Sequence, residues 1–282
     1  MEKLRVAITS GYTASKHAIA LLHEISALPE VEVVLLLQVK TFTFKRLKHL
    51  IRMYGWRDAW EKFRNIFLSS KQNRFAEEIL PMNNFLNERK IGSTTTLKAC
   101  QKLNVKVKRV RSLNEEDSLN SIKQNRVDLI VYAGGGILRN NLIRSTRYGV
   151  LNAHSGPLPF FRGMNCLEWS LFYNVKPEVT VHLIDSGIDT GPILKRFPWE
   201  VSAGDTIFLL RGKSVVKGVV SLLEVVSDFE HFNKNRQKQE IGQGVQFYTM
   251  HPFLKEKINE RLRGGWLPGL LYNEFTQKDF QK

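Results

Sequence analysis

Two side chains that could handle a developing charge, Asn152 and His154, stand one residue apart in the stretch LNAHSGPLPFFRG, Leu151 to Gly163. An apolar run ends at this pair, and alternation along an extended chain would point both side chains to the same side. An asparagine amide can donate a hydrogen bond to an oxyanion, and a protonated histidine can do so with charge assistance. The pair therefore predicts a site that stabilises an oxygen which becomes negative during a reaction.

A loop with two carboxylates and a run of glycines each follow another apolar segment. The loop IDSGIDTG, Ile184 to Gly191, holds Asp185 and Asp189, and GGGIL, Gly134 to Leu138, follows the segment DLIVYA. A carboxylate near a histidine raises its pKa and orients its ring. Successive glycines let the backbone approach a flat ligand closely. Because ligands of open α/β sheets bind beyond the carboxyl ends of the strands, we expect these loops and the Asn-His pair to share one edge of a sheet.

No serine or cysteine stands where a catalytic triad would need its nucleophile. Ser155 directly follows His154, so its side chain should face the other way. The nucleophile is therefore expected to belong to the substrate. Acyl transfer to an amine fits, because the amine attacks a carbonyl, the Asn-His pair holds the oxyanion, and a base removes the surplus proton.

The elements that must position these residues alternate between strand-like and helix-like patterns. Strands are expected at Leu4–Thr9, Val31–Leu37, Lys106–Val110, Asp128–Ala133, Gly149–His154, Val179–Ile184 and Leu194–Val201. One long helix is expected over Thr206–Phe229. This order predicts an α/β fold with an open, mostly parallel twisted sheet and helices on both faces. We expect a main domain over residues 1–230 and a short C-terminal appendage over 231–282.

A basic segment interrupts this alternation. Residues 44–74 hold nine Lys or Arg against two acids, with apolar residues at helical spacing. We predict a basic helical insert at about 44–90. Its apolar face could cover the domain, form a homodimer face, or make peripheral contact with an anionic membrane.

Composition and charge narrow the class of protein. The 282 residues carry a formal net charge of +15, which favours phosphate-rich or carboxylate-rich partners. Cys100 and Cys166 are too few for a disulfide framework or a cysteine-based zinc site, and no metal site is predicted. No apolar stretch approaches the ~20 residues of a membrane-spanning helix, and the N-terminus does not read as a secretory signal. We expect a soluble, cytoplasmic protein with reduced thiols.

LNAHSGPLPFFRG followed by VTVHLIDSGIDTGPIL resembles the formyltransferase family that uses 10-formyltetrahydrofolate. The likeness covers roughly Asp128 to Pro192. It implies a Rossmann-like fold, formyl transfer to an amine, and a catalytic set of Asn152, His154 and Asp189. It also implies 10-formyltetrahydrofolate as the donor co-substrate. The implied folate-binding residues are Gly135, Gly136, Ile137, Leu138, Ile184, Asp185, Ser186 and Gly187.

Within that family the acceptor amine varies while the chemistry does not. The tail here is too short for the C-terminal barrel of initiator-tRNA formyltransferases, and the first loop differs from that of glycinamide ribonucleotide formyltransferases. The chain is most similar in appearance to sugar N-formyltransferases, which implies an amine on a nucleotide-linked amino-deoxysugar for surface polysaccharide biosynthesis. The residues expected to bind this acceptor are Ser10, Gly11, Tyr12, Arg162 and Gly163, with Arg162 near the diphosphate.

Other functions stay open at this point. One is a methionyl-tRNA formyltransferase-like activity, and another is transfer to a small amine such as a hydroxyornithine. A hypothesis from a different class is a non-catalytic basic module that binds RNA or a membrane, although nucleic acid is the less favoured partner. The intact set of Asn152, His154 and Asp189 argues against a dead enzyme scaffold.

Overall fold

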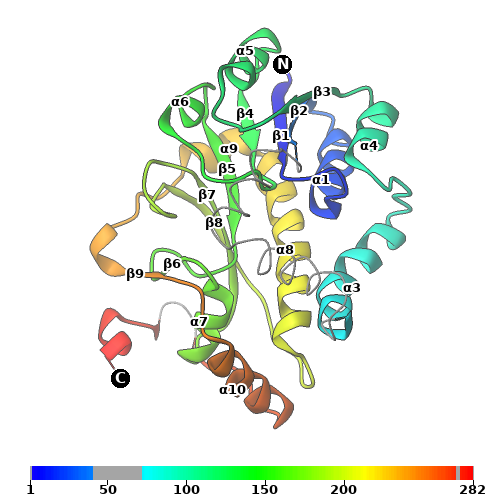
Figure 1. Cartoon of the computed structure of the whole chain (residues 1–282). Helices are drawn as coiled ribbons and strands as arrows, with labels where there is room; N and C mark the ends of the chain where they lie inside the picture. Colours follow the sequence, from blue (N-terminus) through cyan, green and yellow to red (C-terminus); the bar gives the residue numbers. More distant parts are fainter. Residues whose placement is uncertain (1, 41–71, 271–273, 282) are drawn as a thin grey trace, which may run out of the picture.

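A seven-stranded sheet forms the centre of the computed structural model, which describes residues 2–40, 72–270 and 274–281 (Figure 1). The strand order is β3-β2-β1-β4-β5-β7-β8. The strands are β1 Leu4–Ser10, β2 Val31–Val39, β3 Lys106–Val110, β4 Leu129–Val131, β5 Val150–His154, β7 Glu178–Leu183 and β8 Ile193–Pro198. The first five in spatial order run parallel, whereas β7 pairs antiparallel with both β5 and β8. The predicted open, mostly parallel α/β sheet is confirmed.

Helices cover both faces of the sheet, as predicted, because the central strands are apolar on both sides. In β2 only Glu32 is exposed, as expected for a strand between two helical layers. The first face packs against α1 Lys16–Ser26, α3 Gln72–Glu88, α4 Thr96–Leu103, α8 Ile207–Ser227 and α9 Phe229–Lys234. The second face packs against α5 Glu116–Gln124 and α6 Asn140–Ile143. Each face thus has its own apolar core.

The long helix α8 sits within one or two residues of its predicted limits. Thr206 is its N-cap, and its hydroxyl accepts a hydrogen bond from the Leu209 amide at 3.2 Å. Gly212 lets α3 lie close against α8, since a Cβ at this position would collide with the backbone oxygen of Glu78. Of the predicted basic insert, residues 44–71 lie outside the described residues, and the remainder includes the helix α3.

The tail packs against the loop that follows β5. Strand β6, Phe161–Gly163, pairs in parallel with β9, Val245–Phe247, in a second sheet of two strands. Around this sheet lie α7 Cys166–Phe172, α10 Pro252–Arg263 and the short helices Ile241–Gln243 and Gln277–Gln281. The tail therefore forms a short strand and a helix, and its strand pairs with the segment carrying Arg162 and Gly163. The division at residue 230 stays a prediction.

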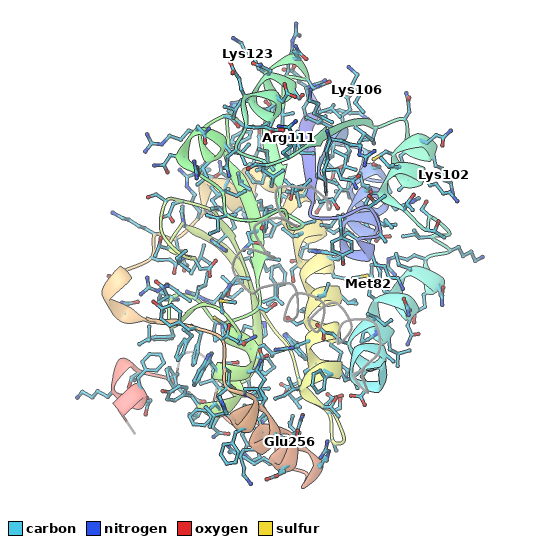
Figure 2. All side chains as sticks on the ribbon, in the orientation of Figure 1. Met82, Lys102, Lys106, Arg111, Lys123 and Glu256 are labelled. Carbon is cyan, nitrogen blue, oxygen red and sulfur yellow. The ribbon has the colours of Figure 1, made fainter. Side chains whose placement is uncertain are left out.

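The surface carries many of the basic side chains. Figure 2 shows Lys106 and Lys123 projecting outward from β3 and α5, at the end of the molecule near the N-terminus. Within the described part of the chain, none of the helices has the length and apolar character needed to cross a membrane.

Candidate active site

Strand β5 presents the Asn-His pair on one face of the sheet. In the β5–β7 ladder, Asn152 lies opposite His182 and His154 lies opposite Thr180. Ala153, between the pair, faces α8, where a Cβ at Gly218 would contact its methyl group at 3.4 Å. Alternation thus places Asn152 and His154 on the same side, as predicted.

The loop after β7 brings Asp189 to His154 by a path different from the one predicted. The sequence suggested that β7 ends at the same sheet edge as β5, but β7 runs antiparallel to β5 and ends beside its first half, with Leu183 opposite Leu151. Leu151 in turn pairs with Val131 at the end of β4, so the loops after β4 and β7 leave the sheet at one level. The loop after β7 then folds back and brings Asp189 to His154.

His154 is held between two oxygen atoms. Its Nδ1 lies 3.3 Å from Asp189 Oδ2, and its Nε2 lies 2.8 Å from the carbonyl oxygen of Phe161. A ring protonated on both nitrogens would donate to both acceptors. The predicted contact between His154 and a substrate oxygen would therefore require exchange of one of these partners.

Asp189 is ionised and fixed in place. Burial opposes its ionisation, but the charge of His154 and the N–H of Gly163 outweigh burial and hold the pKa of the carboxyl below its ordinary value. The Gly163 amide donates to Asp189 Oδ2 at 2.9 Å. The Asp189 backbone adopts the left-handed region, with φ of 53°, which only surrounding contacts can maintain in a non-glycine residue. One such contact is the side chain of Gln239, which donates to the Asp189 carbonyl at 3.0 Å.

A second histidine, His182, belongs to the site and was missed by sequence reasoning. Its Nδ1 lies 3.0 Å from the carbonyl oxygen of Leu183, so this nitrogen carries the proton. Burial lowers the pKa of His182 to about 4, so the ring is neutral and its Nε2 is an acceptor. The Asn152 amino group lies 3.1 Å from Nε2 and donates to it. The available signal was a lone imidazole in the otherwise apolar strand VTVHLI.

His182 therefore determines which way the Asn152 amide points. With one N–H committed to His182, the amide retains a second N–H for a substrate oxygen. His182 Nε2 also lies 3.6 Å from Asp189 Oδ1. Asn152, His154, His182 and Asp189 thus form one cluster built from β5, β7 and the loop after β7.

The glycine loop after β4 has the open backbone that a flat ligand needs. Gly134, Gly135 and Gly136 all have positive φ, between 95° and 130°. A Cβ at Gly135 would collide with Leu113. The side chain of Asn114 holds the residues that follow the glycines. It donates to the Ile137 carbonyl at 2.8 Å and accepts from the Arg139 amide at 2.7 Å. Ile137 is left 85% exposed.

The other predicted folate segment lies after β7. The Ile184 amide donates to the Val150 carbonyl at 2.7 Å, which ties this segment to the start of β5. Asp185 Oδ1 accepts from the Gly187 amide at 3.0 Å and from the Thr190 hydroxyl at 2.6 Å, so Asp185 shapes the loop that contains Ser186. The glycine loop and this segment follow the strands on either side of β5, and their role in binding folate stays a prediction.

The five residues predicted to bind the acceptor fall into two groups. Ser10 ends β1, and Gly11 and Tyr12 follow it. A Cβ at Gly11 would approach the Gly135 amide at 3.4 Å, so this group lies beside the glycine loop. Arg162 and Gly163 lie on β6. Arg162 is buried and donates from Nη2 to the Gly244 carbonyl at 3.0 Å, so at least part of its hydrogen bonding serves the tail.

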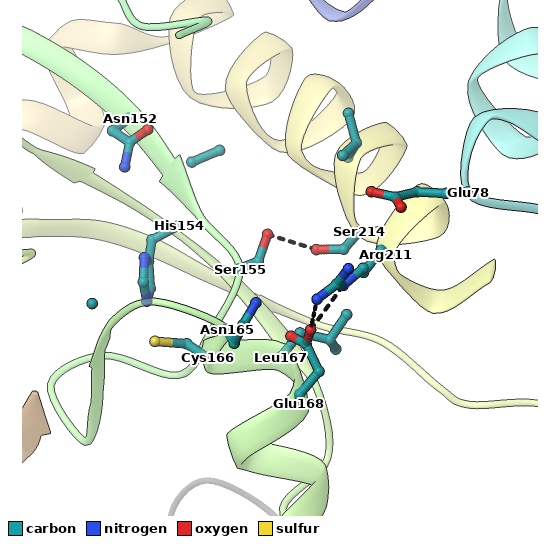
Figure 3. A pocket seen from close by; sticks show the side chains of 13 residues that line it. Glu78, Asn152, His154, Ser155, Asn165, Cys166, Leu167, Glu168, Arg211 and Ser214 are labelled. Carbon is teal, nitrogen blue, oxygen red and sulfur yellow. Dashed lines mark hydrogen bonds and ion pairs between the residues drawn. The ribbon is translucent and has the colours of Figure 1, made fainter. Parts of the chain in front are cut away.

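A pocket of about 320 Å³ adjoins Asn152 and His154 (Figure 3). Its walls are Glu78, Asn152, Ala153, His154, Ser155, Gly163, Asn165, Cys166, Leu167, Glu168, Arg211, Ser214 and Val215. Ser155 points toward α8 and accepts a hydrogen bond from the Ser214 hydroxyl at 2.7 Å. The prediction was only that this side chain faces the other way from His154. Burial, reinforced by nearby carboxylates, raises the pKa of the Cys166 thiol, so it stays protonated and is a poor nucleophile. A nucleophile from the substrate remains the better interpretation.

Comparison with known proteins decides the family. Residues 81–226, which include the whole Asn152–His182–Asp189 cluster, match the family model of the formyl transferases. The chain belongs to the formyl transferase family. Among curated relatives, methionyl-tRNA formyltransferase of Finegoldia magna is 22% identical over 192 residues, which are 67% of this chain and 60% of that protein. The corresponding protein of Blochmanniella pennsylvanica is 33% identical over 134 residues, 47% of this chain and 42% of that protein. The chain thus spans about half the length of these two relatives.

Solved structures of other formyl transferases have the same fold. Phosphoribosylglycinamide formyltransferase from Anaplasma phagocytophilum superposes with a TM-score of 0.54 at 16% identity, covering 88% of this chain and all of that one. A sugar N-formyltransferase from a Shewanella species superposes with a TM-score of 0.52 at 15% identity, covering 92% of this chain and 87% of that one. These likenesses establish the fold and leave the acceptor to be argued from the site.

Proposed function

We propose that the protein transfers the formyl group of 10-formyltetrahydrofolate to the amine of a nucleotide-linked amino-deoxysugar, for surface polysaccharide biosynthesis. The observation that carries this proposal is the cluster of Asn152, His154, His182 and Asp189, two members of which, Asn152 and His154, line a pocket with many polar side chains. Residues 1–230 would be the catalytic domain and 231–282 an extension that supports it. We assign the reaction to the cytoplasm. Homodimer formation and membrane contact stay predictions.

The residues present fit a folate donor. The segment Gly135 to Leu138 would suit a planar ring because Gly136 has no neighbouring atom on the side where a Cβ would lie, and the exposed Ile137 offers an apolar contact. Ile184 to Gly187 would form the opposite wall. When bound, the donor supplies an activated formyl carbon, and all other chemistry falls to this chain's residues and the acceptor.

The roles in the reaction follow from the geometry. Asn152 would donate its second amide N–H to the formyl oxygen while the acceptor amine attacks the carbon. His154 would add a charged donor when its Nε2 exchanges the Phe161 carbonyl for the formyl oxygen. The ionised Asp189 would hold the ring and receive the proton that the amine loses. A C–N bond to the acceptor forms, the C–N bond to the folate breaks, and one proton passes to the folate nitrogen. The transfer is balanced without any other reactant.

The pocket supports a hydroxylated acceptor. Of the twelve side chains that line it, eight are polar or charged and four are apolar. The polar side chains offer hydrogen-bond partners to several ring hydroxyls, and a methionyl side chain would leave these partners unused. This contrast favours a sugar over a methionyl ester.

A second candidate function is formylation of methionyl-tRNA. It is supported by the curated relatives that carry this name and by the net charge of +15, which suits a polyanionic partner.

The two candidates can be separated by one assay. Purified protein is incubated with 10-formyltetrahydrofolate and a panel of nucleotide-linked 3-amino- and 4-amino-dideoxyhexoses, hydroxyornithine, or methionyl-initiator tRNA, and tetrahydrofolate release is followed by absorbance. We expect turnover with at least one nucleotide sugar. Turnover with the tRNA and none with any sugar would overturn the proposed acceptor. Salt-sensitive RNA binding without any turnover would indicate a binding module instead.

A further inference from the structure

Four charged side chains from four different helices meet at the pocket and its wall. Glu168 comes from α7, Arg211 from α8, Lys255 from α10 and Glu78 from α3. Burial and Arg211 lower the pKa of Lys255, while Glu168 and Glu78 raise it, so the four charges act on one another. Glu168 is only 2% exposed. A carboxylate buried to this extent is costly unless its oxygens are bonded.

The two oxygens of Glu168 are used unequally. Arg211 donates to Oε1 from Nε at 2.7 Å and also from Nη2 (Figure 3). Lys255 Nζ lies 3.9 Å from the same oxygen. Oε2, by contrast, accepts no hydrogen bond from any residue in the described part of the chain. A carboxylate oxygen with no hydrogen bond to the described residues is an acceptor available to a donor in the pocket.

The oxygen and the amino group of the Asn165 side chain are also used unequally, but here it is the donor that is left. Its Oδ1 accepts from the Met250 amide at 3.0 Å and from Lys255 Nζ at 3.2 Å. Its amino group makes no hydrogen bond to the described residues, and Asn165 lines the same pocket. Asn165 is the N-cap of α7, and Glu168 follows three residues later, so both side chains lie on the same side of the helix.

We propose that Glu168 and Asn165 together bind a ring hydroxyl of the acceptor. A hydroxyl would donate to Glu168 Oε2 and accept from Asn165 Nδ2, which uses both of its bonding capacities. Arg211 is a positioning residue, because it holds Glu168 by Oε1 and leaves Oε2 toward the ligand. The inference rests on the proposed function and names the residues that select a hydroxylated acceptor.

The same residues offer a diphosphate no free cation in this part of the site. A phosphate group here would face the carboxylates of both Glu168 and Glu78, while the two cations beside them, Arg211 and Lys255, already interact with Glu168. We therefore expect the nucleotide end of the acceptor outside the pocket and the sugar ring inside it.

Two isosteric substitutions test the inference. Glu168→Gln keeps a carbonyl oxygen for Arg211 but replaces Oε2 by an amino group, and Asn165→Asp keeps Oδ1 but replaces the amino group by an oxygen. The control is Glu224→Gln, near the C-terminal end of α8. It removes one negative charge from an exposed ion pair with Lys195 of β8. Each variant is assayed with the nucleotide sugars that the wild type uses. Binding of 5-formyltetrahydrofolate and the thermal unfolding midpoint are also measured.

We expect each pocket variant to lower kcat/KM for the sugar by about 10- to 100-fold, mainly through KM, as for loss of a hydrogen bond to a charged group. Folate affinity should match that of the Glu224→Gln control in both variants. The unfolding midpoint of Asn165→Asp should also match it, whereas Glu168→Gln should lower the midpoint because it weakens the buried ion pair with Arg211. A KM for the sugar within about 2-fold of the wild type in both variants would overturn the inference. So would a parallel loss of folate affinity or folding in both variants, because that would assign the pair a structural role.

Failure of the proposed function would look different. In that case the wild type itself would turn over no nucleotide sugar, whatever its affinity for the folate, and the inference would fall with it.

Discussion

At the scale of single residues, the chemistry depends on how protons are distributed over two histidines. His182 is neutral and gives its Nδ1 proton to the Leu183 carbonyl, so its Nε2 orients the Asn152 amide. His154 instead lies between Asp189 and the Phe161 carbonyl, where a doubly protonated ring would be satisfied. The same residue type thus has two roles because its hydrogen-bond partners differ.

Removing a member of the predicted catalytic set should abolish most of the activity without unfolding the protein. We expect Asn152→Ala, His154→Ala and Asp189→Asn each to lower kcat by about 10² to 10³-fold, because each removes a group that stabilises the developing charge or its proton acceptor. Circular dichroism and steady-state kinetics of the purified variants check this. Turnover near that of the wild type in folded His154→Ala would contradict the assigned role.

His182 should affect turnover through Asn152. In His182→Leu the amide loses the acceptor that fixes its orientation, so we expect kcat to fall by about 10-fold with little change in the KM for folate. Kinetics with saturating acceptor measure this effect. An unchanged kcat would show that Asn152 is held by other contacts.

Sequence reasoning found Asn152, His154 and Asp189 because a short polar pair and an Asp-Thr-Gly loop follow apolar runs. It missed His182, Asn165 and Glu168 for a common reason. Their importance comes from partners far away in the sequence, such as Arg211 and Lys255, and no local spacing encodes those contacts.

At the scale of elements, the apolar strands and the long helix were predictable, since burial on both faces leaves a strong pattern. The antiparallel direction of β7 was not predictable from the sequence. The segment between β5 and β7 contains a helix and is long enough for a parallel crossover. However, Leu167 and Leu171 of α7 pack against Ile258 and Leu262 of α10 instead of covering the sheet, so no crossover forms.

The tail should be required for an intact active site. Phe247 of β9 is buried and stacks on Phe161 and Trp169, with ring centroids 5.4 and 4.9 Å apart. We expect Phe247→Ala to lower the free energy of unfolding by about 3 kcal/mol. Activity should fall as well, because β9 supports the strand whose Gly163 amide binds Asp189. Denaturant unfolding and the formyl transfer assay measure the two effects.

The matched control for this prediction is Phe253→Ala, since Phe253 is 60% exposed on α10. It should change stability by less than about 0.5 kcal/mol and leave activity intact. Equal effects of the two substitutions would show that β9 does not support the site.

At the scale of the whole molecule, buried ionisable groups link stability to pH. His182 has a pKa of about 4 when folded, below the ordinary value of 6.5, so the unfolded chain binds more protons between these values. Protonation of His182 in the unfolded chain therefore lowers the free energy of unfolding as pH falls from 6.5 towards 4, and this loss is absent above pH 6.5. Burial raises the pKa of Glu178 to about 7 despite the opposing charge of Arg196, which gives the opposite slope between about pH 4.5 and 7.

The effects of His182 and Glu178 on the pH dependence of stability oppose each other. The difference in the free energy of unfolding between the wild type and a His182 variant therefore isolates the effect of His182. The stability of the wild type relative to His182→Leu should fall by about 3 kcal/mol between pH 7.5 and pH 4, as expected for a shift of this size. Denaturant unfolding at several pH values measures the difference. A difference that stays constant over this range would show that His182 is not held neutral in the fold.

The central claim is that the cluster of Asn152, His154 and Asp189 passes a formyl group directly to an amine. The most direct measurement is mass spectrometry of the acceptor after incubation with 10-formyltetrahydrofolate that carries ¹³C in the formyl group. We predict a labelled formamide on a nucleotide-linked amino sugar with the wild type, and only traces of it with Asp189→Asn. Release of labelled formate with no labelled acceptor, or equal labelling by the two proteins, would contradict the account.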